Sequence, residues 1–246
     1  KLVCLKDMRI KASDQEIKKS LTGIWKDEHL FTLRQAYQEY NFYQSQIKEC
    51  DSKIEETLLV ITAKLKGGDI TFPEVKKKRS GKNEFNFNSR PVLIAIVGVD
   101  LCEVDGISEV SAVELISEIG TDMSKWKNRK HFSAWLNVAP NTKITGGKII
   151  SSKMQKKKNH AGQTLRMACC SMSQNKGTMG DYARRMKARL GKKGGVVATA
   201  HKLSRIIYTM IKEQKPYDKK LTGLNHETWR QKKINHLEKQ LEMLKT

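Results

Sequence analysis

The 246-residue sequence predicts an all-α protein, in which a long coiled-coil helical segment precedes a compact helical domain. Three observations favour this fold class. Apolar residues recur at intervals of three and four, helix start signals precede several of these segments, and no strand-like alternation of any length appears. The length suffices for one sizeable domain or two small ones with a real hydrophobic core.

Residues 1–66 are predicted to form the helical coiled-coil region. Ser13 and Glu16 have the spacing of a capping box, which starts a short helix running to about Trp25. A second helix start follows at Asp27, and the apolar spacing after it indicates a long helix with a seam of about five heptads. The apolar seam positions are Leu30, Leu33, Tyr37, Tyr40, Ile47, Ile54, Leu58 and Ile61, and Gln44 and Asp51 interrupt them. An intramolecular helical hairpin and a dimeric coiled coil both satisfy this pattern.

Residues 67–91 are predicted to be a basic linker, because glycine, proline and charged residues replace any periodic pattern there. The linker contains the basic run Lys76–Arg79. We interpret this run as a solvated segment that passes near phosphate groups, in preference to a targeting signal.

Residues 92–220 are predicted to form the compact C-terminal domain. The segment Val104–Ser108 lies between a short helix and the helical run Val110–Ile119, which is the order of a helix-hairpin-helix element. Gly106 supplies the unusual backbone angles of the turn, and the amides that begin the next helix would face a phosphate. The local charge is negative, so a glycine that serves only the turn is the alternative.

The rest of this domain is expected to be a loop over Asn141–Lys148 followed by helices over roughly Ala161–Ser173, Met179–Leu190 and Val196–Ile211. A break at Gly191–Gly195 separates the last two helices. Residues 221–246 are predicted to be an amphipathic helical tail. Its apolar face consists of Ile234, Leu237, Leu241 and Leu244.

The positive charge of the chain is concentrated in one stretch. Lys and Arg number 47 against 26 acidic residues, a net charge of +21, and residues 142–220 alone carry 20 basic and 3 acidic side chains. Such an excess favours a polyanionic partner, because lysine and arginine displace counterions from a phosphate backbone. A cationic surface that serves only solubility is the alternative.

Several other classes of protein are disfavoured. No apolar run approaches the ~18 residues of a membrane span, no signal peptide is present, and the five cysteines form no CxxC pair, so we expect a reduced, cytoplasmic protein. The adjacent Cys169 and Cys170 are expected to be ordinary buried thiols. The six histidines lack the spacing of metal ligands. Asp100, Glu103 and Asp105 are close enough for Mg²⁺ binding, but helix capping better explains the two that border the glycine hairpin.

The segment from Thr145 to Lys148 is the strongest candidate for chemistry. It places a hydroxyl beside two glycines, whose backbone allows a phosphate to approach closely. Lys143 and Lys148 flank it and would stabilise negative charge on a reacting phosphate. A loop that only grips phosphate is the alternative, because no base lies nearby in the sequence. Ser151 and Ser152 are rival hydroxyls.

Several sequence blocks carry a resemblance to a known family. GVDLCEVDGISEVSAVELISEIGTDMSKWKNRKHFSAWLNVAP and the following NTKITGGKIISSK resemble the C-terminal domain of the insertion-sequence 116/110/902 transposases. The later LRMACCS, YARRMKARLG and TAHKLSRIIYTMIK continue the similarity. The early RIKASDQEIKKSLTGIWKDEHLFTLRQAYQEYNFYQSQI resembles the coiled-coil insertion of one subgroup.

The resemblance implies a recombinase in two parts. In this family a RuvC-like domain binds Mg²⁺ through a DEDD tetrad, and the C-terminal domain supplies a serine nucleophile five residues after a proline, in a Ser-Gly motif. A bridge RNA pairs with target and donor DNA, and the site is assembled between subunits of a tetramer. Here Thr145 stands five residues after Pro140 and precedes Gly146, so threonine replaces the family serine. Its extra methyl group narrows the approach to phosphorus.

The sequence therefore predicts the C-terminal part of a prokaryotic transposase, with Thr145 as the hydroxyl nucleophile. The expected partners are DNA, a structured bridge RNA and further copies of the chain as a dimer or tetramer. No cofactor is expected within the chain, since Mg²⁺ would belong to a RuvC-like domain preceding Lys1, and the chain alone is expected to be inactive. The candidate nucleic-acid contacts are Gly106, Lys143, Gly146, Gly147, Lys148, Lys153, Lys156, Lys157, Lys158 and Arg166. The alternatives are a non-enzymatic helix-hairpin-helix module and a decayed transposase remnant.

Overall fold

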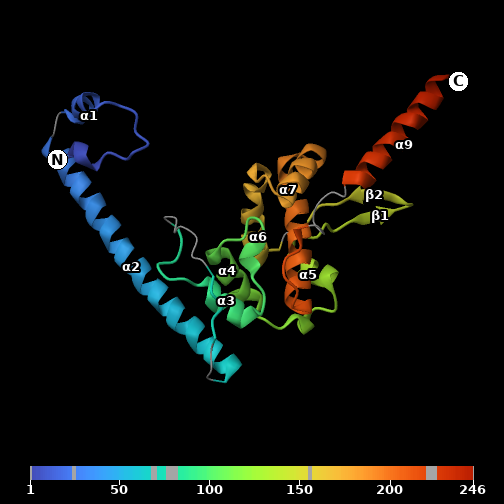
Figure 1. Ribbon diagram of the computed structural model, residues 1–246, viewed down its shortest axis with the longest axis horizontal. Helices are drawn as coiled ribbons and strands as arrows, with labels where there is room; N and C mark the ends of the chain where they lie inside the picture. The colour runs from blue at the N-terminus through green and yellow to red at the C-terminus, as the bar shows by residue number, and fades with distance from the viewer. Residues whose placement is uncertain are drawn as a thin grey trace. The chain divides into compact units, whose positions relative to one another are not determined.

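The computed structural model describes residues 2–23, 26–67, 71–75, 83–154, 157–219 and 226–245 (Figure 1). The described residues are mostly helical, so the predicted fold class is confirmed. The chain divides into two compact units, residues 1–52 and 53–246, and the boundary falls within one long helix. The basic run Lys76–Arg79 lies outside the described residues.

The first unit contains η1 (Leu2–Leu5), α1 (Asp14–Leu21) and most of α2 (Asp27–Lys66). The predicted capping box starts α1. The Glu16 amide donates to Ser13 Oγ at 3.3 Å, and the Ser13 amide donates to a Glu16 carboxylate oxygen at 2.7 Å. Because these contacts satisfy amides that a helix start leaves open, they stabilise the first turn. The helix ends at Leu21, and the predicted end near Trp25 lies outside the described residues.

The long helix α2 is continuous, as its apolar spacing predicts. Its seam residues in the first unit are exposed, among them Leu33, Tyr37 and Tyr40, each 59–65% exposed. In the second unit Leu58 is buried in the core and Ile54 packs against it. The apolar seam residues of the first unit are thus exposed. Pairing of α2 with another helix, within the chain or in a second copy, stays a prediction.

The second unit contains α3 (Arg90–Val97), η2 (Leu101–Glu103), α4 (Glu109–Ile119), η3 (Met123–Lys125), α5 (Arg129–Trp135), β1 (Lys143–Thr145), β2 (Lys148–Ser151), α6 (His160–Cys170), η4 (Met172–Gln174), α7 (Thr178–Glu213) and α9 (His226–Lys245). The apolar face predicted on α4 is confirmed, since Ala112, Leu115, Ile116 and Ile119 are all buried. They contribute to one hydrophobic core, in which Phe132, Leu165 and Leu203 join α5, α6 and α7. In the predicted tail, α9 forms, and the described apolar side chains Ile234, Leu237 and Leu241 are exposed. The side chain of Leu244 lies outside the described part.

Four aromatic rings hold α5 on α7. The centroid of the Phe132 ring lies 4.9 Å from that of Trp126 and 5.5 Å from that of Tyr208. The ring centroids of Trp126 and Trp135 are 5.0 Å apart. The Tyr208 hydroxyl donates to the Trp126 carbonyl at 3.0 Å. Aromatic packing of this kind combines a large buried area with favourable ring geometry, so the cluster fixes the position of α5.

Helix α7 bends at Gly191, where the sequence predicts a break. Gly191 has φ 75° and ψ 175°, which are not helical angles. The residues from Lys192 to Gly195 are helical, so the break is confined to one residue, where five were expected. A Cβ atom on Gly195 would lie 2.6 Å from Lys187 Cα, and the missing side chain therefore lets the two halves of α7 pack closely.

The predicted loop over Asn141–Lys148 is instead part of an antiparallel hairpin. Strands β1 and β2 pair Ile144 with Ile149 and Thr145 with Lys148, around Gly146 and Gly147. Both glycines have positive φ, 54° and 74°, which is the signature of a two-residue type I′ turn. Strands of three and four residues are too short to produce a recognisable alternation, and this explains the difference from the prediction.

The adjacent cysteines differ in exposure. Cys169 is buried as expected, and burial raises the pKa of its thiol to about 12. Cys170 is exposed, contrary to the expectation, because successive residues of a helix are rotated by about 100° and it leaves the buried face on which Cys169 lies. Its thiol donates to the Arg166 carbonyl at 3.3 Å.

This difference predicts selective alkylation. With iodoacetamide at about pH 8, Cys170 is expected to react in the folded protein, whereas Cys169 is expected to react only after unfolding, because the thiolate is the reactive species. Peptide mass spectrometry of folded and denatured samples measures both sites. The exposed Cys4 and Cys50 serve as positive controls and the buried Cys102 as a negative one. Equal reaction rates at Cys169 and Cys170 in the folded protein would contradict the assignment.

Candidate nucleic-acid interface

The hairpin β1–β2 places the Thr145 hydroxyl between two lysines. Thr145 pairs with Lys148 across the last position before the turn, and Lys143 lies two residues earlier on the same strand. Because residues that pair directly across a hairpin point to the same side, Thr145 and Lys148 share one face, and the register of the two strands shifts between Lys143 and Ile144. Residues 140–150 are all exposed, and Figure 1 shows the strands standing clear of α6 and α7. The predicted candidates Lys143, Thr145, Gly146, Gly147 and Lys148 therefore come together.

The opposite face of the hairpin is apolar. Ile144 and Ile149 pair with each other and are 62% and 67% exposed, and the neighbouring Ile150 is 68% exposed. Exposed β-branched side chains of this kind favour the strand conformation without contributing to the core.

The two legs of the hairpin are joined at their base by Asn137. This residue is buried with φ 53°, and its side-chain amide donates to the Lys157 carbonyl at 2.7 Å. Arg166 on α6 donates to the Asn137 carbonyl at 3.3 Å. The segments before and after the hairpin are thereby tied to each other and to α6. Part of the Arg166 guanidinium, predicted as a phosphate contact, is used within the protein.

Asn159 fixes the start of α6 against the end of α5. Its side-chain oxygen accepts from the Gly162 amide at 2.7 Å, and its side-chain amide donates to the Trp135 carbonyl at 3.1 Å. A Cβ atom on Gly162 would lie 1.8 Å from the Leu136 carbonyl oxygen, so this approach requires glycine. Sequence reasoning did not single out Asn137 or Asn159. An asparagine just before a helix is a preferred N-cap, which was the available signal for Asn159.

The remaining candidate lysines lie around this base. Lys153, Lys157 and Lys158 are exposed in the segment between β2 and α6. Lys156 lies outside the described residues. These exposed lysines are accessible to a polyanion.

Gly106 lies elsewhere, at the turn between η2 and α4. It has φ 86°, and a Cβ atom there would lie 2.5 Å from Met172 Cε and 3.1 Å from the Ala168 carbonyl oxygen. Both the positive φ and the close packing against the C-terminal end of α6 explain why this position requires glycine. The element before the turn is a 3-10 helix of three residues, so the helix-hairpin-helix assignment stays a prediction.

Asp100 caps the start of η2. One carboxylate oxygen accepts from the Cys102 amide at 2.9 Å, and the other pairs with Arg90 at 2.6 Å. Among the described residues, no group of three His, Cys, Asp or Glu side chains is placed to hold a metal ion. Within the same part of the chain, no recorded hydrogen bond joins a carboxylate or an imidazole to the Thr145 hydroxyl.

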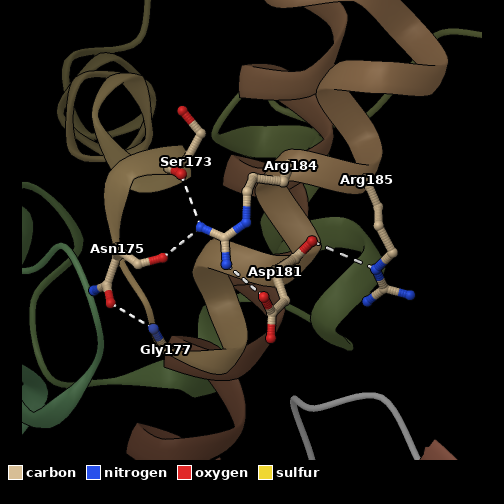
Figure 2. A network of polar contacts seen from close by, with 6 residues as sticks. All are labelled: Ser173, Asn175, Gly177, Asp181, Arg184 and Arg185. Carbon is tan, nitrogen blue, oxygen red and sulfur yellow. Dashed lines mark hydrogen bonds and ion pairs between the residues drawn. The ribbon is translucent and has the colours of Figure 1, made fainter.

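Arg184 and Arg185 are consecutive on α7 but point to different sides, as Figure 2 shows. Arg184 donates to the carbonyls of Ser173 and Asn175 at 2.8 and 2.6 Å and forms an ion pair with Asp181. It therefore closes the loop that precedes α7. Arg185 is half-buried and lies near the Tyr182 ring, with 5.8 Å between the guanidinium carbon and the ring centroid.

The comparison with protein families matches the segment that contains this hairpin. Residues 99–184 match the Transposase IS116/IS110/IS902 family. The matched transposase segment runs from Val99 through the hairpin and α6 to Arg184, and it includes Thr145. This match supports a transposase-related role and, with it, an interaction with DNA. No curated protein and no solved structure matches the chain significantly. No helix in the described ranges is long and apolar enough to cross a bilayer.

Proposed function

We propose that the chain is the nucleic-acid-binding C-terminal part of an insertion-sequence transposase, in which Thr145 supplies the hydroxyl nucleophile for DNA strand cleavage and exchange. The observation that carries the proposal is the exposed Thr145 hydroxyl between Lys143 and Lys148, within the segment that matches the transposase family. An exposed hydroxyl paired with Lys148 across the hairpin, and with Lys143 two residues away on its own strand, suits attack on a phosphodiester.

In the proposed step, Thr145 Oγ1 attacks phosphorus, and a new P–O bond forms while one bond to a deoxyribose oxygen breaks. The hydroxyl proton passes to a base, and the leaving deoxyribose oxygen takes up a proton. Lys143 and Lys148 stabilise the negative charge that accumulates on the phosphate oxygens. The turn glycines bear no side chains, so a DNA strand reaches Thr145 without obstruction from the turn.

The base and the metal are proposed to come from a RuvC-like domain that acts together with this chain. Among the residues that the structure describes, no three His, Cys, Asp or Glu side chains lie together as a metal site would require. Mg²⁺ bound by an acidic tetrad would supply Lewis-acid stabilisation of the reacting phosphate. Bridge RNA is proposed as a second nucleic-acid partner. The exposed seam of α2 is proposed to pair with a second copy of the chain.

A non-enzymatic nucleic-acid-binding module, including a decayed transposase remnant, is the second candidate. One observation favours it: Thr145 replaces the serine that the family resemblance implies, and no base is bonded to its hydroxyl in the described part of the chain. The two candidates share the binding of nucleic acid and differ in the role of Thr145.

Replacement of both hairpin lysines tests the shared binding function. The double variant Lys143→Gln/Lys148→Gln is expected to reduce the slope of log K against log salt by about 2, because each lost phosphate contact removes close to one released counterion. Fluorescence anisotropy with duplex DNA over a range of salt concentrations measures the slope. The exposed pair Lys125 and Lys127 provides a control of equal charge change. An equal reduction in the control Lys125→Gln/Lys127→Gln would show that only net charge matters and would remove the hairpin from the interface.

A further inference from the structure

An open hollow of about 750 Å³ lies between the start of α5, the C-terminal half of α7 and the segment after α7. It is separate from the hairpin, and none of the predicted site residues lines it. Its volume is within the range of ligand-binding clefts. Along α7 the lining residues are basic from His201 to Arg205 and mostly apolar from Ile206 to Met210.

The basic end of the hollow consists of Arg129, His201, Lys202 and Arg205. Burial, and then the neighbouring Arg185 and Arg205, lowers the pKa of Lys202 below its ordinary value. Burial and Arg205 lower the pKa of His201 in the same way. Among the described residues, no recorded ion pair joins a carboxylate to Arg129, Arg185 or Arg205. The cations therefore repel one another, and a bound anion would relieve this repulsion.

Two buried serines hold the basic end in place. The hydroxyls of Ser133 on α5 and Ser204 on α7 are 2.8 Å apart and fully buried. Ser133 Oγ also lies 2.9 Å from the Arg129 carbonyl oxygen, and Ser204 Oγ lies 2.8 Å from the His201 carbonyl oxygen. One serine therefore donates to the other, which donates to a carbonyl of its own helix, and this contact fixes the first turn of α5 beside Arg205. A preorganised site loses less conformational entropy on binding.

Tyr182 orients the lysine of this site. Lys202 Nζ lies 4.3 Å from the centroid of the Tyr182 ring, a cation–π contact. Arg185 lies near the same ring, with 5.8 Å between its guanidinium carbon and the ring centroid, and it donates to the Asp181 carbonyl at 3.4 Å (Figure 2). The ring thus lies between Lys202, which lines the hollow, and Arg185, which does not.

The other end of the hollow is suited to a flat, largely apolar group. Ile206, Met210 and Pro216 line it, and Glu213 and Asp218 lie at its edge. Glu213 also pairs with Lys215 at 2.9 Å. A nucleobase has an apolar face and hydrogen-bond donors at its rim, which matches an apolar wall edged by carboxylates.

We propose that this hollow binds an unpaired nucleotide of a DNA or RNA strand. Arg129, Lys202 and Arg205 hold its phosphate, and its base lies against Ile206, Met210 and Pro216. The inference rests on the proposed function in that the chain must bind nucleic acid, but it uses residues distinct from the hairpin. A base that is already unpaired enters without the free-energy cost of unstacking a duplex.

The substitution Thr209→Glu tests the site with little risk to the fold. Thr209 lines the middle of the hollow, is half-buried, and its hydroxyl donates only to the Arg205 carbonyl of its own helix, at 3.0 Å. A glutamate there places negative charge and bulk where the nucleotide is proposed to lie. Ala188→Glu, at an exposed position of the same helix, makes an equal change in net charge. Circular dichroism checks that both variants fold.

Binding is measured by fluorescence anisotropy on the full chain with single-stranded DNA and RNA of about 12 nucleotides, a matched abasic strand and a duplex. The wild-type chain is expected to bind the strands with bases at least about fivefold more tightly than the abasic strand. Thr209→Glu is expected to weaken single-strand binding at least about tenfold more than Ala188→Glu does and to abolish that preference. Duplex binding is expected to change equally in the two variants.

The outcomes separate the two proposals. If the wild-type chain binds none of the probes, the proposed function fails. If it binds them and Thr209→Glu behaves as Ala188→Glu does, the hairpin proposal stands and the hollow is not a nucleotide site. If Thr209→Glu and Arg205→Gln weaken binding but the wild-type chain does not distinguish the abasic strand, the placement of the base is overturned.

Discussion

The substitution Phe132→Ala is expected to lower the free energy of unfolding of the second unit by about 3–5 kcal/mol. Phe132 is 1% exposed, and its ring contacts those of Trp126, Trp135 and Tyr208. Truncation removes the transfer free energy of a full aromatic ring and leaves a cavity that three large rings cannot close without moving. Chemical denaturation followed by tryptophan fluorescence measures the change, because Trp126 and Trp135 lie in the affected cluster.

A phenylalanine on the surface provides the matched control. Phe31 on α2 is 63% exposed, so Phe31→Ala is expected to change the free energy of unfolding by less than about 0.5 kcal/mol. The position of α5 also matters for the proposed functions, because α5 carries Arg129 and precedes the hairpin. A loss below about 1.5 kcal/mol in Phe132→Ala would mean that the aromatic cluster does not hold α5 on α7.

The helical framework could be predicted from the sequence because its determinants are local. The capping box at Ser13, the buried face of α4 and the break at Gly191 each depend on residues within a few positions of one another. The hairpin could not be predicted in the same way, since strands of three and four residues carry too few positions to establish a period. Its two adjacent glycines have positive φ, which places them in a defined turn.

The contacts that shape the candidate sites are tertiary and leave little trace in the sequence. Asn137 reaches Lys157 across 20 residues, and Ser133 meets Ser204 across 71. The hollow beside Arg205 exists because α5 packs on α7, which no local pattern specifies. Most of its lining comes from α7 and the segment after it, and Arg129 joins them from α5.

The basic residues of the chain have different roles, which the net charge does not distinguish. Arg166 and Arg184 both lie in the strongly basic stretch, yet each donates to backbone carbonyls of the protein. Lys143 and Lys148 stand exposed on the hairpin, and Arg205 faces the hollow. The net charge thus predicts a polyanionic partner, while the structure separates cations that stabilise the fold from those that are accessible to a ligand.

The substitution Thr145→Ala is expected to reduce strand transfer at least about 100-fold in a reaction that contains the chain together with its RuvC-like domain, because removal of a covalent nucleophile abolishes the pathway it serves. Binding of DNA is expected to change less than about twofold, since Thr145 is exposed at the hairpin end and its loss leaves Lys143 and Lys148 in place. Thr145→Ser keeps the hydroxyl and removes the methyl group beside it. This variant is expected to match or exceed the wild-type rate, as the approach to phosphorus becomes wider.

A covalent intermediate distinguishes chemistry from binding. Denaturing electrophoresis of labelled DNA is expected to show a protein–DNA adduct for the wild type and Thr145→Ser, and none for Thr145→Ala. The rival hydroxyls Ser151 and Ser152 provide the controls, and replacement of either by alanine is expected to leave the adduct intact. If Thr145→Ala still forms the adduct while Ser151→Ala or Ser152→Ala does not, the nucleophile is that serine. If no variant alters the adduct or the rate, the hairpin only grips phosphate, because the same exposed geometry then serves binding without a bond to phosphorus.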